Sequence, residues 1–261
     1  MLLQRKTAVI YGAGGAIGGA VSRAFASEGA RVFLTGRSLS ALNVVAREIV
    51  EAGGLAETAQ VDAFDERAVE GHAVNVVRKT GAIDISLNVI SIPHVQGKPL
   101  VEQRVDDFAL SVMQYARTQF LTATTAARHM ITRRSGVILM MTAPPGRVGR
   151  PLVGAFGTAC AAIEAFARTL AAEVGRHGVR VVCLRSSGSP GETDAGRHFE
   201  HHAKAAGVSA EQVQNKLKEG TTLRRLTTLD EVARVAVFAA SDQASAITAT
   251  SVNLSCGLVV D

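Results

Sequence analysis

Residues 7–18 read TAVIYGAGGAIG, and this stretch indicates the fold of the chain. Residues 7–11 are a short apolar run that predicts a buried β-strand. Glycines follow at positions 12, 14, 15 and 18, and from position 17 to position 28 apolar residues recur at helical spacing. A strand, a glycine-rich turn and a helix in this order are typical of a dinucleotide-binding turn.

Each glycine of this turn has a physical role in such a site. Gly12 permits a tight turn, Gly14 and Gly15 keep side chains away from a pyrophosphate, and Gly18 lets the helix pack closely on the sheet. The start of the helix then offers free N–H groups and the positive end of its dipole to the phosphates. The alternative interpretation is that the glycines serve packing alone.

Strand-like and helix-like segments alternate along the rest of the chain. A serine begins the second helix, and Thr228 with Glu231 forms a capping box at the last one. This alternation predicts one domain over residues 1–261, a Rossmann-type doubly wound parallel sheet of about seven strands with helices on both faces. The predicted strands are 7–11, 31–35, 56–61, 83–88, 137–141, 180–184 and 251–254, and the predicted helices are 17–28, 38–52, 65–80, 105–133, 152–177 and 228–241. Residues 190–222 are polar and poorly periodic, which predicts a mobile lid over the pocket.

Composition excludes several classes of function. The chain carries a net charge of +5 without any dense run of Lys and Arg, and its aromatic content is low, with no Trp and two Tyr, so we expect no stacking surface and no nucleic-acid partner. No apolar run approaches the ~20 residues that cross a membrane. Cys160, Cys183 and Cys256 are far apart and form no CxxC, so we expect no zinc site and a cytoplasmic protein.

The end of the second predicted strand indicates which dinucleotide binds. NAD sites commonly carry an acid there for the ribose 2′-hydroxyl, whereas this chain has Gly36, Arg37 and Ser38. Arginine pairs bidentately with phosphate, so NADP is favoured over NAD. Asp62, after the third strand, is placed to accept a hydrogen bond from the adenine amino group or to cap the next helix.

With these segments in place, the chain resembles the short-chain dehydrogenase/reductase family over nearly all of its length. The resemblance rests on the glycine turn and on the motifs at 35–37, 61–62, 83–84, 177–181, 240–242 and 252–253. It implies a homodimer or homotetramer built across two long helices. Together with the motifs above, it assigns the dinucleotide to Gly12, Gly14, Gly15, Ile17, Gly18, Arg37, Ser38, Asp62, Ala63 and Asn88.

The same resemblance implies a catalytic tetrad that this sequence does not carry. The family uses a tyrosine as proton donor, a lysine four residues later, a serine thirteen residues before the tyrosine, and an asparagine on the preceding helix. Here Phe156, Cys160, Ala143 and Tyr115 stand in those positions. Phenylalanine transfers no proton and alanine donates no side-chain hydrogen bond, so the scaffold is retained without the usual mechanism.

Other polar residues are candidates for chemistry in the pocket. Tyr115 is either a proton donor or a packing residue, and Cys160 a nucleophile or a buried small residue. His94 is a pocket acid or a loop histidine, and Arg147 and Arg150 hold a substrate anion or face solvent. His198, His201 and His202 have helical spacing but lack a carboxylate to complete a metal site, so we expect no metal.

Three hypotheses about function follow. The chain is a divergent NADP-dependent oxidoreductase with a relocated acid, a non-catalytic dinucleotide sensor or regulator, or an inactive partner subunit of an active relative. Turnover of the cofactor separates the first hypothesis from the other two. The sequence names no substrate.

Overall fold

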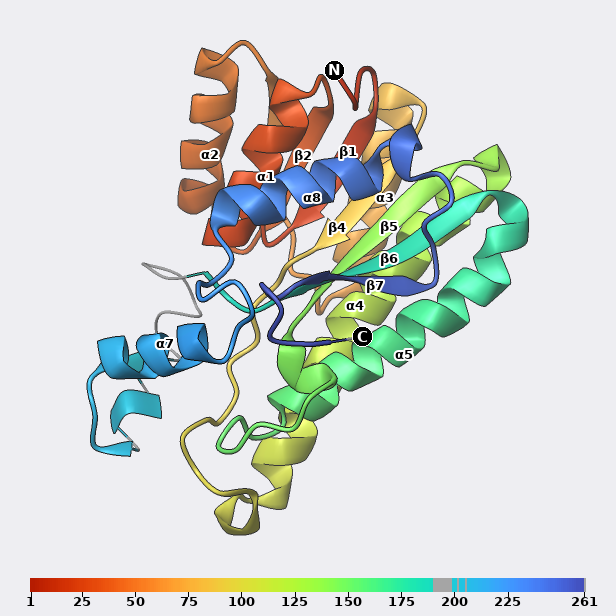
Figure 1. Ribbon diagram of the computed structural model, residues 1–261. Coiled ribbons are helices and arrows are strands. Elements are labelled where there is room, and N and C mark those ends of the chain that lie inside the picture. The colour runs from red at the N-terminus through yellow and green to blue at the C-terminus, as the bar shows by residue number, and fades with distance from the viewer. Residues whose placement is uncertain (190–198, 201, 205, 261) are drawn as a thin grey trace.

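The structure is a computed structural model that describes residues 1–189, 199–200, 202–204 and 206–260. These residues form a seven-stranded parallel sheet in the order β3-β2-β1-β4-β5-β6-β7 (Figure 1). The predicted doubly wound Rossmann-type sheet is therefore confirmed. The strands are β1 (Thr7–Tyr11), β2 (Arg31–Gly36), β3 (Leu55–Gln60), β4 (Ile85–Asn88), β5 (Gly136–Thr142), β6 (Val179–Ser186) and β7 (Thr250–Leu254).

Helices cover both faces of the sheet. One face carries α1, α2 and α8, and the opposite face carries α3, α4 and α5 (Figure 1). A further helix, α7, stands away from the sheet beside the loops at its carboxyl edge (Figure 1). The helices are α1 (Ala16–Ser27), α2 (Leu39–Glu51), α3 (Glu66–Thr80), α4 (Val105–Arg133), α5 (Phe156–Val174), α7 (Ala210–Glu219) and α8 (Leu229–Ala240).

Strand β1 lies in the middle of this layered core. All five of its residues are buried, as the apolar run predicts. Alternate side chains point to opposite faces, so Ala8 and Ile10 join the core under α1 and α8, while Val9 and Tyr11 join the core under α3, α4 and α5. Burial on both faces is what a central parallel strand requires.

The chain changes direction across the sheet at this strand. Strand β1 pairs with β2 on one side and with β4 on the other, so the crossovers that follow β1 and β4 run opposite ways. Their loops come close at the carboxyl edge, because a Cβ on Gly12 would lie 3.1 Å from the backbone nitrogen of Ile90. Such a switch point leaves a crevice for ligands in open α/β sheets.

The fifth helix is shorter than the sequence predicts. The expected helix over residues 152–177 begins instead at Phe156 and gives way to a 3-10 turn after Val174. Leu152 and Gly154 both have left-handed backbone conformations, with φ angles of 64° and 58°, which a right-handed helix excludes. The residues before Phe156 therefore form a loop.

The segment over residues 190–222 contains regular structure that the sequence analysis missed. Residues 210–219 form α7, whose N-terminus carries a capping box between Ser209 and Gln212. Its apolar residues Ala210, Val213 and Leu217 recur at helical spacing, but they are few and only Leu217 is buried, so the polar composition hid this short amphipathic helix. Residues 190–198 lie outside the described residues, so the prediction of a mobile lid stays a prediction.

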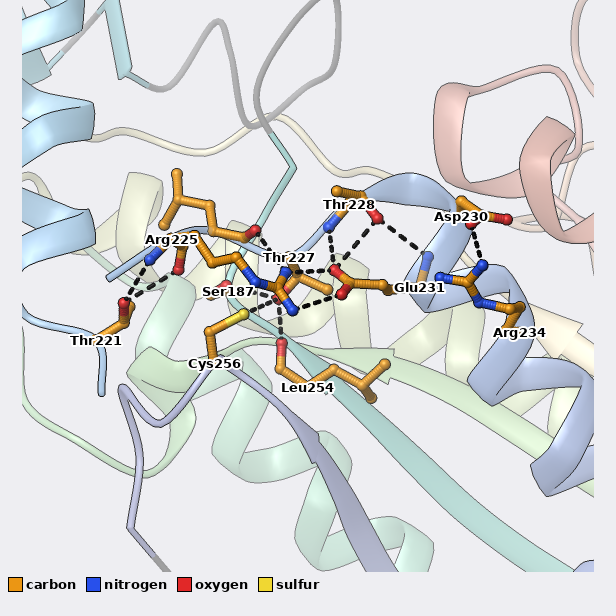
Figure 2. Close-up of polar contacts among 11 residues, drawn as sticks. Ser187, Thr221, Arg225, Thr227, Thr228, Asp230, Glu231, Arg234, Leu254 and Cys256 are labelled. Carbon is orange, nitrogen blue, oxygen red and sulfur yellow. Dashed lines mark hydrogen bonds and ion pairs between the residues drawn. The ribbon is translucent and has the colours of Figure 1, made fainter. Parts of the chain in front are cut away.

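Polar side chains join the loop after β6 to the start of α8 and the end of β7. The hydroxyl of Thr227 donates to the backbone oxygen of Leu254 at 2.5 Å and lies 3.0 Å from the hydroxyl of Ser187 (Figure 2). The predicted capping box of Thr228 and Glu231 is present, and Arg225 binds the same carboxylate in a bidentate pair at 2.8 and 2.6 Å (Figure 2). These contacts join the loop after β6, the start of α8 and the end of β7 to one another.

Gly18 and Gly15 provide a matched pair of variants for the packing of α1. A Cβ on Gly18 would lie 2.2 Å from the backbone oxygen of Gly12, whereas one on Gly15 would meet that oxygen at 3.4 Å. We expect Gly18→Ala to lower the free energy of unfolding by about 1–3 kcal/mol, because the overlap is with backbone and outweighs the ~1 kcal/mol gain in helix propensity. Gly15→Ala should cost less, about 0.5–1 kcal/mol, because Gly15 meets no backbone overlap but is the N-cap of α1, where alanine is disfavoured. Urea unfolding followed by circular dichroism measures both, and equal stabilities of the two variants would contradict this account.

Candidate functional site

A cavity of about 570 Å³ lies at the carboxyl ends of the strands. Its walls come from the glycine turn after β1 and from the loops after β4, β5 and β6, with the start of α5 on one side. Phe199, Val213 and Leu217 line it as well. The volume falls within the roughly 300–1,000 Å³ of small-molecule sites.

The glycine turn has one position that no protein neighbour requires to be glycine. Gly12 has a φ of +85°, and a Cβ on Gly14 would lie 2.9 Å from the Cβ of Ala41, so packing accounts for these two. At Gly15 the backbone is extended and the space beyond it is open, apart from the Gly12 oxygen at 3.4 Å. Within the described residues, no side chain caps α1. The open space at Gly15 and the uncapped backbone N–H groups at the start of α1 together suit the phosphates of a ligand.

The residues predicted to hold the adenosine end surround the ends of β2 and β3. The Arg37 side chain is exposed, and among the described residues no carboxylate lies within ion-pair distance of its guanidinium. Ser38 caps α2 by accepting from the backbone nitrogen of Ala41. Asp62 is exposed and accepts from the backbone nitrogen of Phe64 at 3.1 Å, and Ala63 is buried beside it. Arg37 is thus a free cation at this end of the crevice.

Asn88 has a structural role at the end of β4. Its amide nitrogen donates to the hydroxyl of Thr122 at 3.0 Å, and its side-chain oxygen accepts from the backbone nitrogen of Ile90 at 3.0 Å. The side chain therefore fixes the turn that carries Val89 and Ile90 into the cavity wall.

The four residues at the positions of the expected tetrad meet in this one cavity. Tyr115 comes from α4, Ala143 follows β5, and Phe156 and Cys160 lie on the first turns of α5. The rings of Tyr115 and Phe156 are 5.7 Å apart. Ile17 and Gly18 line the same cavity, so the structure brings these side chains together with part of the glycine turn.

The hydroxyl of Tyr115 is engaged with the loop after β4. It donates to the backbone oxygen of Ile92 and accepts from the backbone nitrogen of the same residue, both at 3.3 Å. The side chain is buried, and burial raises the pKa of this phenol above its ordinary value. Tyr115 is therefore protonated throughout the neutral pH range.

Cys160 has the properties of a core thiol. Its side chain is buried, and burial raises the pKa of the thiol to about 12. His202 lines this cavity, and the ring of His94 stacks on Phe156 with the ring centres 4.6 Å apart. A neutral thiol is a weak nucleophile, so Cys160 does not have the environment of a catalytic cysteine.

Two of the candidate histidines, His94 and His202, are joined by a chain of polar contacts. His94 Nδ1 lies 2.7 Å from the backbone oxygen of Ile92, its Nε2 contacts the amide nitrogen of Gln96, and the amide oxygen of Gln96 lies 2.6 Å from His202 Nε2. Because a backbone oxygen only accepts, His94 carries its proton on Nδ1 and accepts from Gln96 at Nε2. The part of the chain that the structure describes holds no cluster of three or more metal-ligating side chains, and His198 and His201 lie outside it.

The two candidate arginines after β5 differ in position. Arg147 is exposed and lies outside the cavity wall, whereas Arg150 is half-buried and lines the cavity. Burial lowers the pKa of the Arg150 guanidinium below its ordinary value, although arginine stays charged. Of these two residues, only Arg150 can meet a ligand inside the cavity.

A buried ion pair beneath the cavity was missed by the sequence analysis. Arg185, at the end of β6, donates from Nε and Nη2 to the two carboxylate oxygens of Glu164, each at 2.8 Å, and Thr142 donates to the same carboxylate at 3.0 Å. Both charged side chains are about 5 % exposed. The available signal was Glu164, an acid with three apolar residues on either side of it in α5, since charges are almost never buried without a partner.

Next to this pair is a buried hydroxyl without a partner. Ser186 Oγ lines the cavity at the end of β6 and has no hydrogen bond to any described residue. An unsatisfied buried hydroxyl costs about 1–3 kcal/mol, so a polar ligand group in the cavity is favoured. The open space at Gly15, the uncapped start of α1 and this hydroxyl together fit a dinucleotide, which the residues from Gly12 to Gly18 and Ser186 would hold.

The chain is similar to known proteins over nearly its whole length. Residues 12–259 match the family described as enoyl-(acyl carrier protein) reductase. An uncharacterized oxidoreductase, YxbG, from Bacillus subtilis is 30% identical, the match covering 98% of this chain and 92% of the relative. The structure of NAD+-bound xylitol dehydrogenase superposes with a TM-score of 0.93 at 26% identity, covering 98% of this chain and 100% of that one. A gluconate 5-dehydrogenase from Burkholderia cenocepacia, solved with NADP and tartrate, shares the fold with a TM-score of 0.86 at 24% identity, covering 98% and 96%.

Among the described residues, the structure contains no helix that is both long enough and apolar enough to cross a membrane.

The ion pair under the cavity can be tested by removing one charge or both. Glu164→Gln removes the carboxylate that accepts from Nε and Nη2 of the buried Arg185, and we expect this loss to lower the free energy of unfolding by about 3–5 kcal/mol. The double variant Glu164→Leu with Arg185→Met removes both charges at similar volume, and its free energy of unfolding should fall much less. Urea unfolding at constant pH measures both variants. A single variant as stable as the wild-type protein would contradict the importance of the pair.

Proposed function

Because the chain belongs to the short-chain dehydrogenase/reductase family, we propose that it is an NADP(H)-binding oxidoreductase-family protein that has lost the family's usual proton transfer. One observation supports this proposal above all. Phe156, Ala143 and Cys160 line the cavity beside the glycine turn, and none of these side chains exchanges a proton at neutral pH, since the pKa of the Cys160 thiol is raised to about 12.

Any chemistry that remains in this cavity is proposed to use Tyr115 as proton donor. A reduced nicotinamide supplies a hydride to a carbonyl carbon when it is bound. Tyr115 is the one tyrosine of the described cavity wall, and its phenol is protonated because burial raises its pKa. To donate to a substrate oxygen, the Tyr115 hydroxyl must first break its hydrogen bond to the Ile92 backbone oxygen. A protonated phenol can donate a proton to a substrate, so reduction is favoured over oxidation. If the phenol is poorly placed, the ~10²–10⁴-fold rate contribution of general acid catalysis is lost.

The two non-catalytic hypotheses remain alternatives, and the surface of α4 supports an assembly. Leu110, Met113 and Phe120 share one face of this helix and are 48%, 59% and 54% exposed. The ring of Phe120 lies 5.7 Å from that of Phe166 on α5. This apolar face across the two long helices favours the expected homodimer or homotetramer, and it is equally the surface that an inactive partner subunit would use.

The preference for NADP over NAD depends on Arg37. Its exposed guanidinium has no carboxylate nearby among the described residues, so it is available to a 2′-phosphate. We expect Arg37→Asp to weaken NADPH binding by about 1.5–3 kcal/mol, which is the scale of a hydrogen bond to a charged group. NADH binding should change little. Fluorescence titration of both cofactors checks this, and equal affinities of the wild-type protein for NADPH and NADH would contradict the preference.

Turnover tests the loss of the usual mechanism. With a panel of ketones and NADPH, we expect rates far below the 1–10³ per second that is usual for enzymes. Any residual reduction should fall at least tenfold in Tyr115→Phe while NADPH affinity stays unchanged. Between pH 6 and 9 this rate should not fall through ionisation of Tyr115, because its pKa lies above the ordinary value.

A wild-type rate in the usual range would reject the proposal that the mechanism is lost. Full residual activity in Tyr115→Phe would reject the role of Tyr115 alone. The matched control is Tyr11→Phe, because Tyr11 is the other tyrosine of the chain, is buried in the core and does not line the cavity.

A further inference from the structure

Arg150 is a cation at the cavity that no described residue neutralises. It lies in the loop between β5 and α5, half-buried, and lines the cavity. The structure gives its guanidinium no hydrogen bond and no ion pair with any described residue. Arg185 provides the contrast, since that buried guanidinium has the bidentate carboxylate of Glu164 at 2.8 Å. A charge held partly out of water without a partner is costly, so an anion from outside is favoured at Arg150.

The described wall of the cavity contains no acidic side chain that could serve as that partner. Its other permanent cation is Lys216, at the end of α7, and neither Asp nor Glu contributes to it. A site with cations and no described carboxylate attracts an anionic ligand and disfavours a cationic one.

The surroundings of Arg150 are apolar. Pro151, Leu152 and Val153 follow it in the loop, and Val213 and Leu217 face the cavity from α7. These side chains suit a hydrocarbon body, since burying apolar surface contributes roughly 25 cal/mol per Å². A guanidinium matches a carboxylate in a planar bidentate pair, which a lysine cannot do.

We propose that the cavity takes an organic acid with an apolar body, and that Arg150 binds its carboxylate. This inference deepens the proposed function, because the acid would share the cavity with the dinucleotide. Phosphates of the dinucleotide are the competing source of an anion, but the glycine turn and Arg37 already offer groups to them at other walls of the crevice.

The test compares an acid with its neutral isostere. Isothermal titration calorimetry of the full chain at pH 7.5, with no nucleotide present, measures the binding of octanoate and of octanamide. We expect the wild-type protein to bind octanoate ten- to a hundredfold more tightly than octanamide. Arg150→Gln should remove this difference and leave octanamide binding unchanged, and Arg150→Lys should keep only part of it. Arg147→Gln is the matched control, because Arg147 is exposed in the same loop and lies outside the cavity wall.

Three results would overturn the proposal: no binding of octanoate, equal binding of octanoate and octanamide, or an equal loss in Arg147→Gln. A parallel titration with NADPH keeps the two proposals apart. Octanoate selectivity without NADPH binding supports the acid site and rejects the proposed cofactor. If Arg150→Gln weakens NADPH binding and leaves octanoate binding intact, the cation belongs to the dinucleotide and the acid site is rejected.

Discussion

The close approach of α1 to the turn after β1 is the constraint on which the rest of the structure depends. Gly18 lies against the backbone of Gly12 so closely that not even a methyl group fits between them. This contact sets α1 on the face of the sheet, where it packs against α2 and α8. The turn that contains Gly12 also lies against the backbone of Ile90 in the loop after β4. At the switch point, therefore, backbone atoms of these two loops approach each other closely.

Burial then decides the chemistry that the cavity can perform. Tyr115 and Cys160 are both kept neutral, because removal from water disfavours their charged forms. The charges close to the cavity are of two kinds. Glu164 and Arg185 neutralise each other beneath it, whereas Arg150 faces it without a described partner. The described wall of the site therefore combines an apolar interior with the permanent positive charges of Arg150 and Lys216, an environment suited to binding more than to proton transfer.

Local signals in the sequence predicted the elements that local forces determine. The apolar run of β1, the capping serine of α2 and the capping box of α8 lie where the sequence analysis expected them. Prediction failed where backbone conformation or a few contacts decide the structure. The start of α5 moved to Phe156 because Leu152 and Gly154 are left-handed, and α7 was missed because it buries only Leu217. The signals for α7 were short, namely Ala210, Val213 and Leu217 at helical spacing and the capping box that Ser209 begins.

The sequence by itself determined the class of fold, the glycine turn and the identity of the residues at the expected catalytic positions, because these depend on residue type and on short spacings. Packing between distant segments decides which of these residues lie in the same environment and whether each side chain is charged or neutral there. It brought Tyr115 to the Ile92 backbone, joined Glu164 to Arg185 from a different element, and separated Arg150 in the cavity from Arg147 in solvent. Burial and pairing between distant segments set these properties, and neither is written in the neighbouring residues of the chain.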